Sequence, residues 1–90
     1  MMMKIHEGFL LREVAGTPII MPVGAAAERL NGMIKLNATS AFLFRTLAGG
    51  CDEDGLVTAL LAEYDVDGDT ARRDVRAFLD VLRSAGVLDE

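Results

Sequence analysis

The segment from Asp67 to Gly86 carries the clearest periodic pattern in this chain. Its apolar residues recur at intervals of three and four, which places them on one face of an α-helix. These residues are Ala71, Val75, Phe78, Leu79 and Leu82. Asp67 suits the N-cap position, because its side chain can accept from backbone N–H groups in the first turn, and Gly86 closes the segment. The pattern therefore predicts a long amphipathic helix whose apolar face needs a partner surface.

The first third of the chain is typical of β-strands. Two apolar segments, Phe9–Val14 and Thr17–Val23, flank the dipeptide Ala15–Gly16. Such a two-residue break suits a tight hairpin, in which Gly supplies a positive φ. Pro18 and Pro22 cannot donate ladder hydrogen bonds. The second segment is therefore expected to be an edge strand or to hold its prolines near its ends.

A third strand is predicted at Met33–Leu36, directly after a turn signal at Asn31–Gly32. The preceding segment, Gly24–Leu30, is compatible with a loop, a short helix or a strand. From the end of the third strand onward, the pattern of apolar residues changes from alternating to helical.

Three helices are predicted in the rest of the chain. Asn37 can cap the first one, which ends at Gly49–Gly50. The second runs roughly from Asp52 to Tyr64, with acidic residues in its first turn, where they complement the helix dipole. Strands followed by helices predict an α+β domain, with the helices packed on one face of a small sheet.

The length and charge of the chain limit its function. Ninety residues suit a single domain over residues 1–90, and we expect residues 1–5 to be flexible. The net charge is -5, and the acidic excess lies in the second half of the chain. Affinity for nucleic acid depends largely on neutralising phosphates. An acidic domain is therefore poorly suited to bind nucleic acid.

The metal-binding and reactive side chains are sparse. Cys51 is the single cysteine, so no internal disulfide can form, and one Cys with the distant His6 cannot make a zinc site. A reducing, cytoplasmic location is the simplest interpretation. The N-terminus lacks the apolar stretch of a signal peptide, and no apolar run could cross a bilayer. We expect no catalytic residues, no bound cofactor, no metal and no membrane contact.

Five short segments together resemble the PqqD-like family, whose members include coenzyme PQQ synthesis protein D. They comprise a strand ending in Leu-Asn, a helix end, a Tyr-Asp-Val segment, an Asp-Val-x-x-Phe-Leu-x-x-Leu helix and a closing Gly-Val-Leu. In this chain they are Ile34–Thr39, Leu47–Gly50, Tyr64–Val66, Asp74–Leu82 and Gly86–Leu88. Each segment is short, but their order and spacing are specific, and the resemblance covers about residues 5–90.

The resemblance implies both a fold and a role. The fold would be winged helix-turn-helix-like, with three N-terminal strands followed by three helices. The role would be that of a recognition element that binds the leader of a ribosomally made precursor peptide. Such an adaptor delivers the peptide to a modifying enzyme, for example a radical SAM enzyme or a maturation protease. In relatives the leader adds as an extra strand beside the third strand, against the third helix.

Strand addition needs an exposed sheet edge, and the predicted third strand would supply it. Alternation along a strand places Met33 and Lys35 on one face and Ile34 and Leu36 on the other. These are the first four residues of the predicted peptide site. A simpler alternative is that the edge is merely short, with Lys35 there to discourage aggregation.

The predicted third helix supplies the other four site residues. At about 100° per residue, Arg72, Arg76 and Arg83 gather beside Leu79 at the border of the apolar face, and Asp74 lies on the opposite flank. This stripe could hold a peptide with apolar anchors and carboxylates, since Arg pairs well with carboxylates. The alternative is that the arginines pair with the chain's own acids. Either flank of the helix could face the third strand.

Two other functions are compatible with the fold. A winged-helix DNA-binding regulator shares the architecture, and the arginines of the last helix favour it, although the acidic balance opposes it. A small enzyme is disfavoured, because no catalytic set of side chains is evident. A homodimer could also form through the open strand edge.

Overall fold

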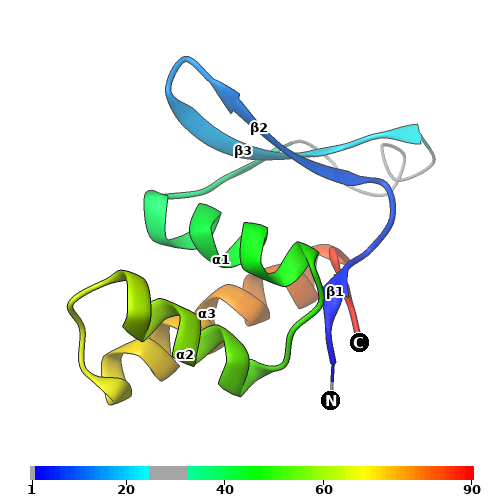
Figure 1. Ribbon diagram of the computed structural model, residues 1–90. Helices are drawn as coiled ribbons and strands as arrows, with labels where there is room; N and C mark the ends of the chain where they lie inside the picture. Colours follow the sequence, from blue (N-terminus) through cyan, green and yellow to red (C-terminus); the bar gives the residue numbers. More distant parts are fainter. Residues whose placement is uncertain (1, 25–32) are drawn as a thin grey trace.

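The strand-like and helical parts of the sequence form two layers in the computed structural model, which describes residues 2–24 and 33–90 (Figure 1). A small antiparallel sheet lies on one side, and three helices pack beneath it. The predicted α+β, winged helix-turn-helix-like class is confirmed. In chain order the elements are β1 (Lys4–Ile5), β2 (Phe9–Val14), β3 (Thr17–Pro22), β4 (Ile34–Lys35), α1 (Ala38–Ala48), α2 (Glu53–Glu63), α3 (Gly68–Ala85) and β5 (Leu88–Asp89).

The hairpin between β2 and β3 forms where the sequence predicts it. Val14 pairs with Thr17, so the turn contains two residues, and both have positive φ: 51° at Ala15 and 81° at Gly16. Positive φ at both central residues is the requirement of the type I′ turn, whose twist matches that of the flanking strands. The turn therefore sets the register of the whole hairpin.

The prolines of β3 mark strand ends, and the alternative of an edge strand is wrong. The strand order is β2-β3-β4, so β3 is central. The backbone N–H of Val23 donates to the Gly8 carbonyl on the β2 side, which turns the neighbouring Pro22 nitrogen toward β4. On the same side, Leu36 donates to the Pro18 carbonyl at 2.8 Å. Because both prolines lack an N–H, β3 offers β4 few donors.

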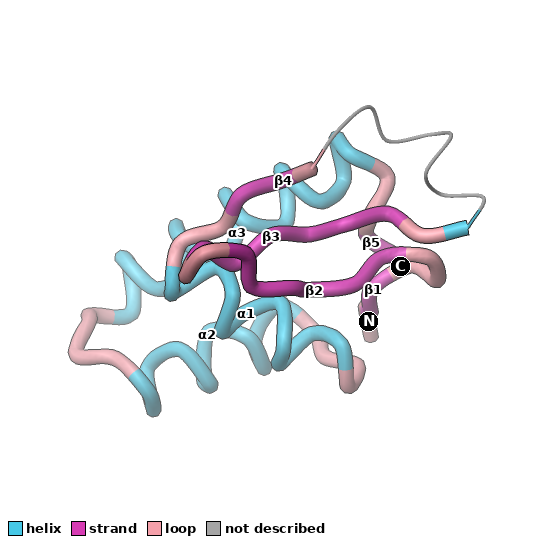
Figure 2. The backbone as a smooth tube through the Cα atoms, turned by 90° about the horizontal axis from the view of Figure 1, so that it is seen from above, coloured by secondary structure: helices cyan, strands magenta, loops and turns pink. Residues whose placement is uncertain are grey.

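Strand β4 is correspondingly shorter than the Met33–Leu36 strand predicted from the sequence. It pairs with β3 through Ile34 opposite Ile20 and Lys35 opposite Ile19. Within the described ranges no strand lies on its other side, so its outer edge is open (Figure 2). The predicted turn at Asn31–Gly32 and most of the ambiguous Gly24–Leu30 segment lie outside the described residues.

The three helices begin at side-chain caps. Asn37, Asp52 and Asp67 each accept a hydrogen bond from the backbone N–H three residues later, at 2.7–2.8 Å. The caps predicted at Asn37 and Asp67 are confirmed. The core fills the space between the sheet and the helices, with Ile20 contributing from β3. Its fully buried helical residues include Leu43, Leu47, Leu56, Leu60, Val75, Leu79 and Leu82.

The N-terminal residues Met3–Ile5, expected to be flexible, pair with distant parts of the chain. Met3 is 5% exposed and exchanges backbone hydrogen bonds with Cys51, at 2.7 and 2.9 Å. Lys4 and Ile5 then form β1, which pairs with β5. Buried apolar surface and paired backbone groups together hold this segment against the core. None of the described helices is long and apolar enough to span a membrane.

Gly86 ends α3 in the left-handed conformation, and substitution there should destabilise the domain. Its φ is 73°, and its N–H and that of Val87 donate to the last-turn carbonyls of Arg83 and Leu82. A Cβ at this position would meet no neighbouring atom, so Gly86→Ala tests backbone strain alone. We expect a loss of about 1–2 kcal/mol in the free energy of unfolding.

Gly68→Ala is the matched control for this prediction. Gly68 lies in the first turn of α3, and an added Cβ would also meet open space there. Since Ala restricts the unfolded chain more than Gly, we expect this substitution to stabilise the domain by about 0.5 kcal/mol. Urea unfolding of both variants measures the two changes in the free energy of unfolding. Equal changes would contradict the left-handed conformation of Gly86.

Candidate functional site

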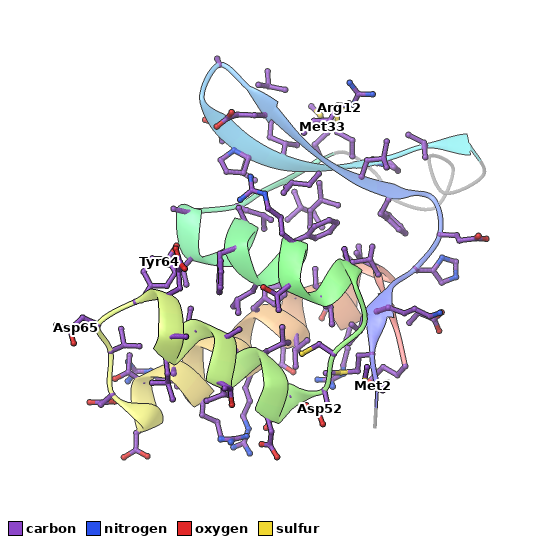
Figure 3. All side chains as sticks on the ribbon, in the orientation of Figure 1. Met2, Arg12, Met33, Asp52, Tyr64 and Asp65 are labelled. Atoms are coloured by element: carbon purple, nitrogen blue, oxygen red, sulfur yellow. The ribbon has the colours of Figure 1, made fainter. Side chains whose placement is uncertain are left out.

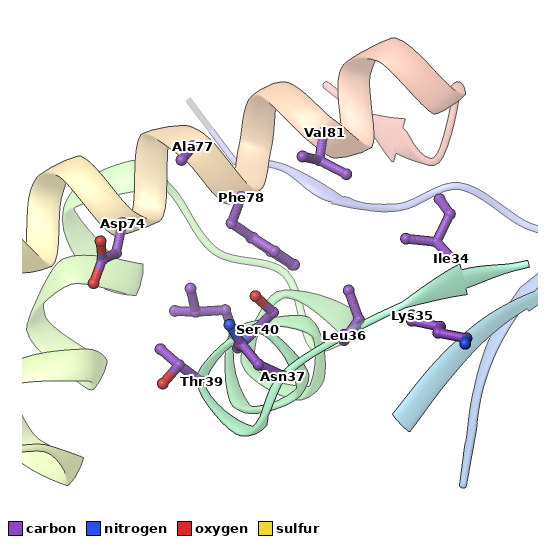
Figure 4. Close-up of a pocket in the computed structure, with 11 residues that line it drawn as sticks. Ile34, Lys35, Leu36, Asn37, Thr39, Ser40, Asp74, Ala77, Phe78 and Val81 are labelled. Carbon is purple, nitrogen blue, oxygen red and sulfur yellow. The ribbon is translucent and has the colours of Figure 1, made fainter. Parts of the chain in front are cut away.

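A groove lies between the open edge of β4 and one flank of α3 (Figure 4). Its volume is about 350 Å³. The start of α1 closes it from below, between β4 and α3. The residues from β4 and its end are Ile34, Lys35 and Leu36, and those from α3 are Asp74, Ala77, Phe78 and Val81. The groove therefore runs along the sheet edge and has an α-helix as its other wall.

The backbone groups of Lys35 face the groove side. In an antiparallel pair, successive residues direct their N–H and C=O groups alternately toward and away from the partner strand. Leu36 donates to the Pro18 carbonyl, so its groups face β3. Lys35, one residue earlier, must direct its N–H and C=O away from β3. This strand edge thus offers one donor and one acceptor that β3 does not pair.

One end of the groove is lined by apolar side chains. Phe78 reaches from α3 toward β4 and is only 5% exposed, so it forms the floor. Val81, one turn further along α3, is 49% exposed and forms an open apolar wall. Ile34 and Leu36 are half-buried and pack against the core. An extended segment laid in the groove would therefore bury apolar side chains as well as pair its backbone.

The opposite end of the groove is polar. Thr39 and Ser40 come from the first turn of α1, and the Asp74 side chain lies near them in Figure 4. The Asp74 side chain is 46% exposed, and its nearest basic atom among the described residues is the Arg73 Nε at 4.0 Å. The groove thus carries an accessible carboxylate at one end.

The structure brings together only part of the predicted site. Ile34, Lys35 and Leu36 line the groove, as the edge-strand interpretation requires. Met33 is 58% exposed and lies with Arg12 over the sheet face that points away from the helices (Figure 3). It adjoins the groove along the chain but does not line it.

The arginine stripe lies outside the groove, on the flank of α3 that meets α2 and the C-terminal residues. Arg72 contacts Glu53 at 2.7 Å and Asp54 at 2.8 Å, and Arg76 approaches Glu53 at 3.3 Å. These predicted site residues therefore pair with acids of α2 and do not face β4. The alternative of pairing within the chain describes them better.

Arg83 and Leu79 also lie outside the groove. Arg83 forms hydrogen bonds to Glu90 at 2.9 and 3.0 Å. Leu79 is 0% exposed, because the buried arc of α3 is wide enough to include it, and it offers no surface to a ligand. The flank that does face β4 carries Asp74, Ala77 and Val81. Their spacing of three and four residues is visible in the sequence. Only the position of β4 shows that this flank of α3 lines the groove.

The Arg83–Glu90 pair predicts a pH dependence of stability. The Arg83 hydrogen bond holds the pKa of the Glu90 carboxyl below its ordinary value. A carboxyl group whose pKa is lower in the folded state than in the unfolded state stabilises the fold at pH values above its unfolded pKa. This contribution is lost as the pH falls through the folded-state pKa. We expect Glu90→Gln to unfold at the same urea concentration as the wild type at low pH, but at a lower one at neutral pH. An identical offset at both pH values would contradict the pairing.

Cys51 is not suited to act as a nucleophile. Burial, and then the adjacent Asp52 carboxylate, raise the pKa of its thiol. Reactive cysteines need the opposite shift, because the thiolate is the nucleophile. The side chain instead lies against the core, where Met3 pairs with its backbone.

Two solved structures share this arrangement of a small sheet over three helices. One is TbiB1 in complex with the TbiA(beta) leader peptide, with 24% identity, a TM-score of 0.76 and coverage of 96% of this chain and 94% of that chain. The other is lasso peptide synthetase B1 complexed with the leader peptide, with 19% identity, a TM-score of 0.76 and 98% coverage of both chains. At these identities the likeness establishes the fold.

The family is established separately. The family model of coenzyme PQQ synthesis protein D (PqqD) matches residues 9–88, and this chain belongs to that family. The resemblance stated from the sequence is thereby confirmed. A search of the curated proteins gave no significant match.

Proposed function

We propose that this protein is a non-catalytic adaptor that captures the leader of a ribosomally made precursor peptide by β-strand addition. The observation that carries the proposal is the outer edge of β4, which no described strand pairs, beside a groove with apolar side chains at one end. An incoming strand would pair with the N–H and C=O of Lys35, which gives affinity without regard to sequence. Side chains on alternate residues would enter the groove against Phe78 and Val81, which gives selectivity.

Membership of the PqqD family supports this proposal, as do the complexes of the two similar structures with leader peptides. The captured leader would then be presented to a modifying enzyme, of the radical SAM or the maturation protease type. The outer sheet face with Met33 and Arg12 points away from the helices (Figure 3) and would stay accessible to that enzyme.

DNA binding by α3 is the less favoured function. Three of its arginines pair with acids of the same chain, and the net charge is -5. A helix that reads DNA needs cations directed at phosphates and bases. A gel shift that is strong at low salt and collapses at high salt would reverse this preference.

An NMR titration with the leader of a precursor peptide, where a neighbouring reading frame encodes one, tests the adaptor function. We expect the backbone amide shifts to concentrate at residues 33–36 and 74–81. Arg72 and Arg76 should change little, because they lie on the other flank of α3. Shifts that spare the β4 edge altogether would contradict the proposal.

A second copy of the chain is an alternative occupant of the same edge. Sedimentation before the titration identifies this case. A dimer that the leader converts to monomer would show that both compete for β4.

A further inference from the structure

The polar and the aliphatic residues of the groove lie at different ends of it. Asp74 lies at the polar end near Thr39 and Ser40, while Ile34 and Val81 lie toward the other end (Figure 4). No ion pair joins Asp74 to Lys35, the basic residue that lines the groove, within the described part of the chain. An occupant of the groove therefore meets a carboxylate at one end and aliphatic surface at the other.

The Asp74 carboxylate is available to a ligand. The 4.0 Å approach of the Arg73 Nε is too long for a hydrogen bond, and the Arg73 side chain is 75% exposed to solvent. Arg72 and Arg76 are held on the other flank by Glu53. An incoming basic side chain would thus find an acceptor to which no arginine of the described residues donates a hydrogen bond.

We propose that Asp74 selects a peptide with Lys or Arg at the position that faces it and an aliphatic residue at the position that faces Val81. This inference rests on the proposed strand addition and specifies the sequence of the strand. Asp74 and Val81 are about 10 Å apart along α3, at about 1.5 Å per residue. A strand covers that distance in about three residues, at about 3.3 Å each.

The spacing of the two selected residues follows from the pleat. Only alternate side chains of an added strand enter the groove, so the basic and aliphatic residues should be roughly two or four positions apart. A carboxylate at the position facing Asp74 would be repelled, and this repulsion adds discrimination to the attraction.

Selection from a displayed library of random, strand-length peptides tests the inference. The targets are the wild type, Asp74→Asn, Asp74→Lys and the control Asp65→Asn. Asp65 lies in the loop between α2 and α3, and its substitution makes the same change in net charge outside the groove (Figure 3). Each enriched peptide is also checked for a shift of the Lys35 amide, which reports binding at the strand edge.

The wild type and the Asp65 variant should both enrich Lys or Arg at the expected distance from Leu, Ile or Val. Asp74→Asn should lose the basic preference, and Asp74→Lys should enrich Asp or Glu at the same position. A selected peptide should bind Asp74→Asn about threefold more weakly than the wild type, since a half-exposed ion pair contributes modestly. If Asp74→Lys does not fold, the presence or loss of the basic preference in the isosteric Asp74→Asn variant is the deciding result.

The two proposals fail in different ways. Peptides that shift the Lys35 amide but show no basic preference would overturn the role of Asp74 and leave strand addition in place. A selection in which no peptide shifts the Lys35 amide would overturn both.

Discussion

Lys35→Pro is expected to weaken leader binding by about tenfold or more while the domain stays folded. Proline removes the one backbone N–H of β4 that points away from β3, and the ring occupies the place where an added strand would pair. The ladder to β3 is kept, because Leu36 and its hydrogen bond to Pro18 are unchanged. Proline is tolerated where its missing N–H faces outward from an edge strand. Fluorescence anisotropy with a labelled leader measures the effect.

Lys35→Ala is the matched control for the proline variant. It removes the same side chain but keeps the backbone N–H. We expect it to bind the leader within about threefold of the wild type, since an exposed lysine contributes little. Equal losses in the two variants would assign the binding to the lysine side chain and contradict strand addition.

Leu79→Ala is expected to reduce the free energy of unfolding by about 2–5 kcal/mol, which is a large part of the stability of a small domain. Leu79 is 0% exposed and belongs to the core between α3 and its neighbours. Its truncation leaves a cavity that the packed side chains only partly fill. Urea unfolding followed by circular dichroism measures the loss.

Val81→Ala, two residues further along α3, should weaken leader binding but leave the stability of the domain nearly unchanged. Val81 is 49% exposed and lines the groove, so its truncation should change stability by less than about 0.5 kcal/mol. It should weaken leader binding by about threefold to tenfold, because apolar surface in the groove is lost. A Val81 variant that unfolds easily, or a Leu79 variant that stays stable, would contradict the assignment of the two flanks of α3.

Local features of the fold could be predicted from the sequence because short-range chemistry determines them. Ala15–Gly16 can adopt the positive φ values of a tight hairpin turn. Asn37 and Asp67 cap their helices through backbone groups three residues away. The apolar spacing of α3 likewise follows from the helical repeat. None of these features depends on how distant elements pack.

The features that the sequence could not decide depend on distant contacts. Helical periodicity shows that Arg72 and Asp74 lie on different flanks of α3, but it cannot show which flank β4 approaches. Glu53, on another helix, holds Arg72 away from the groove. Strand β1 has two residues and pairs with the opposite end of the chain, so it carries no periodic signal of its own. Contacts between residues far apart in the sequence therefore determine which flank of α3 faces β4 and where β1 forms.

Hydrogen exchange of two neighbouring amides tests strand addition most directly. The Leu36 N–H is already bonded to the Pro18 carbonyl, whereas the Lys35 N–H points away from β3. On addition of the leader, exchange at Lys35 should slow strongly, while exchange at Leu36 should change far less. Unchanged exchange at Lys35 in a fully bound sample would contradict the proposal that the leader joins the sheet at β4.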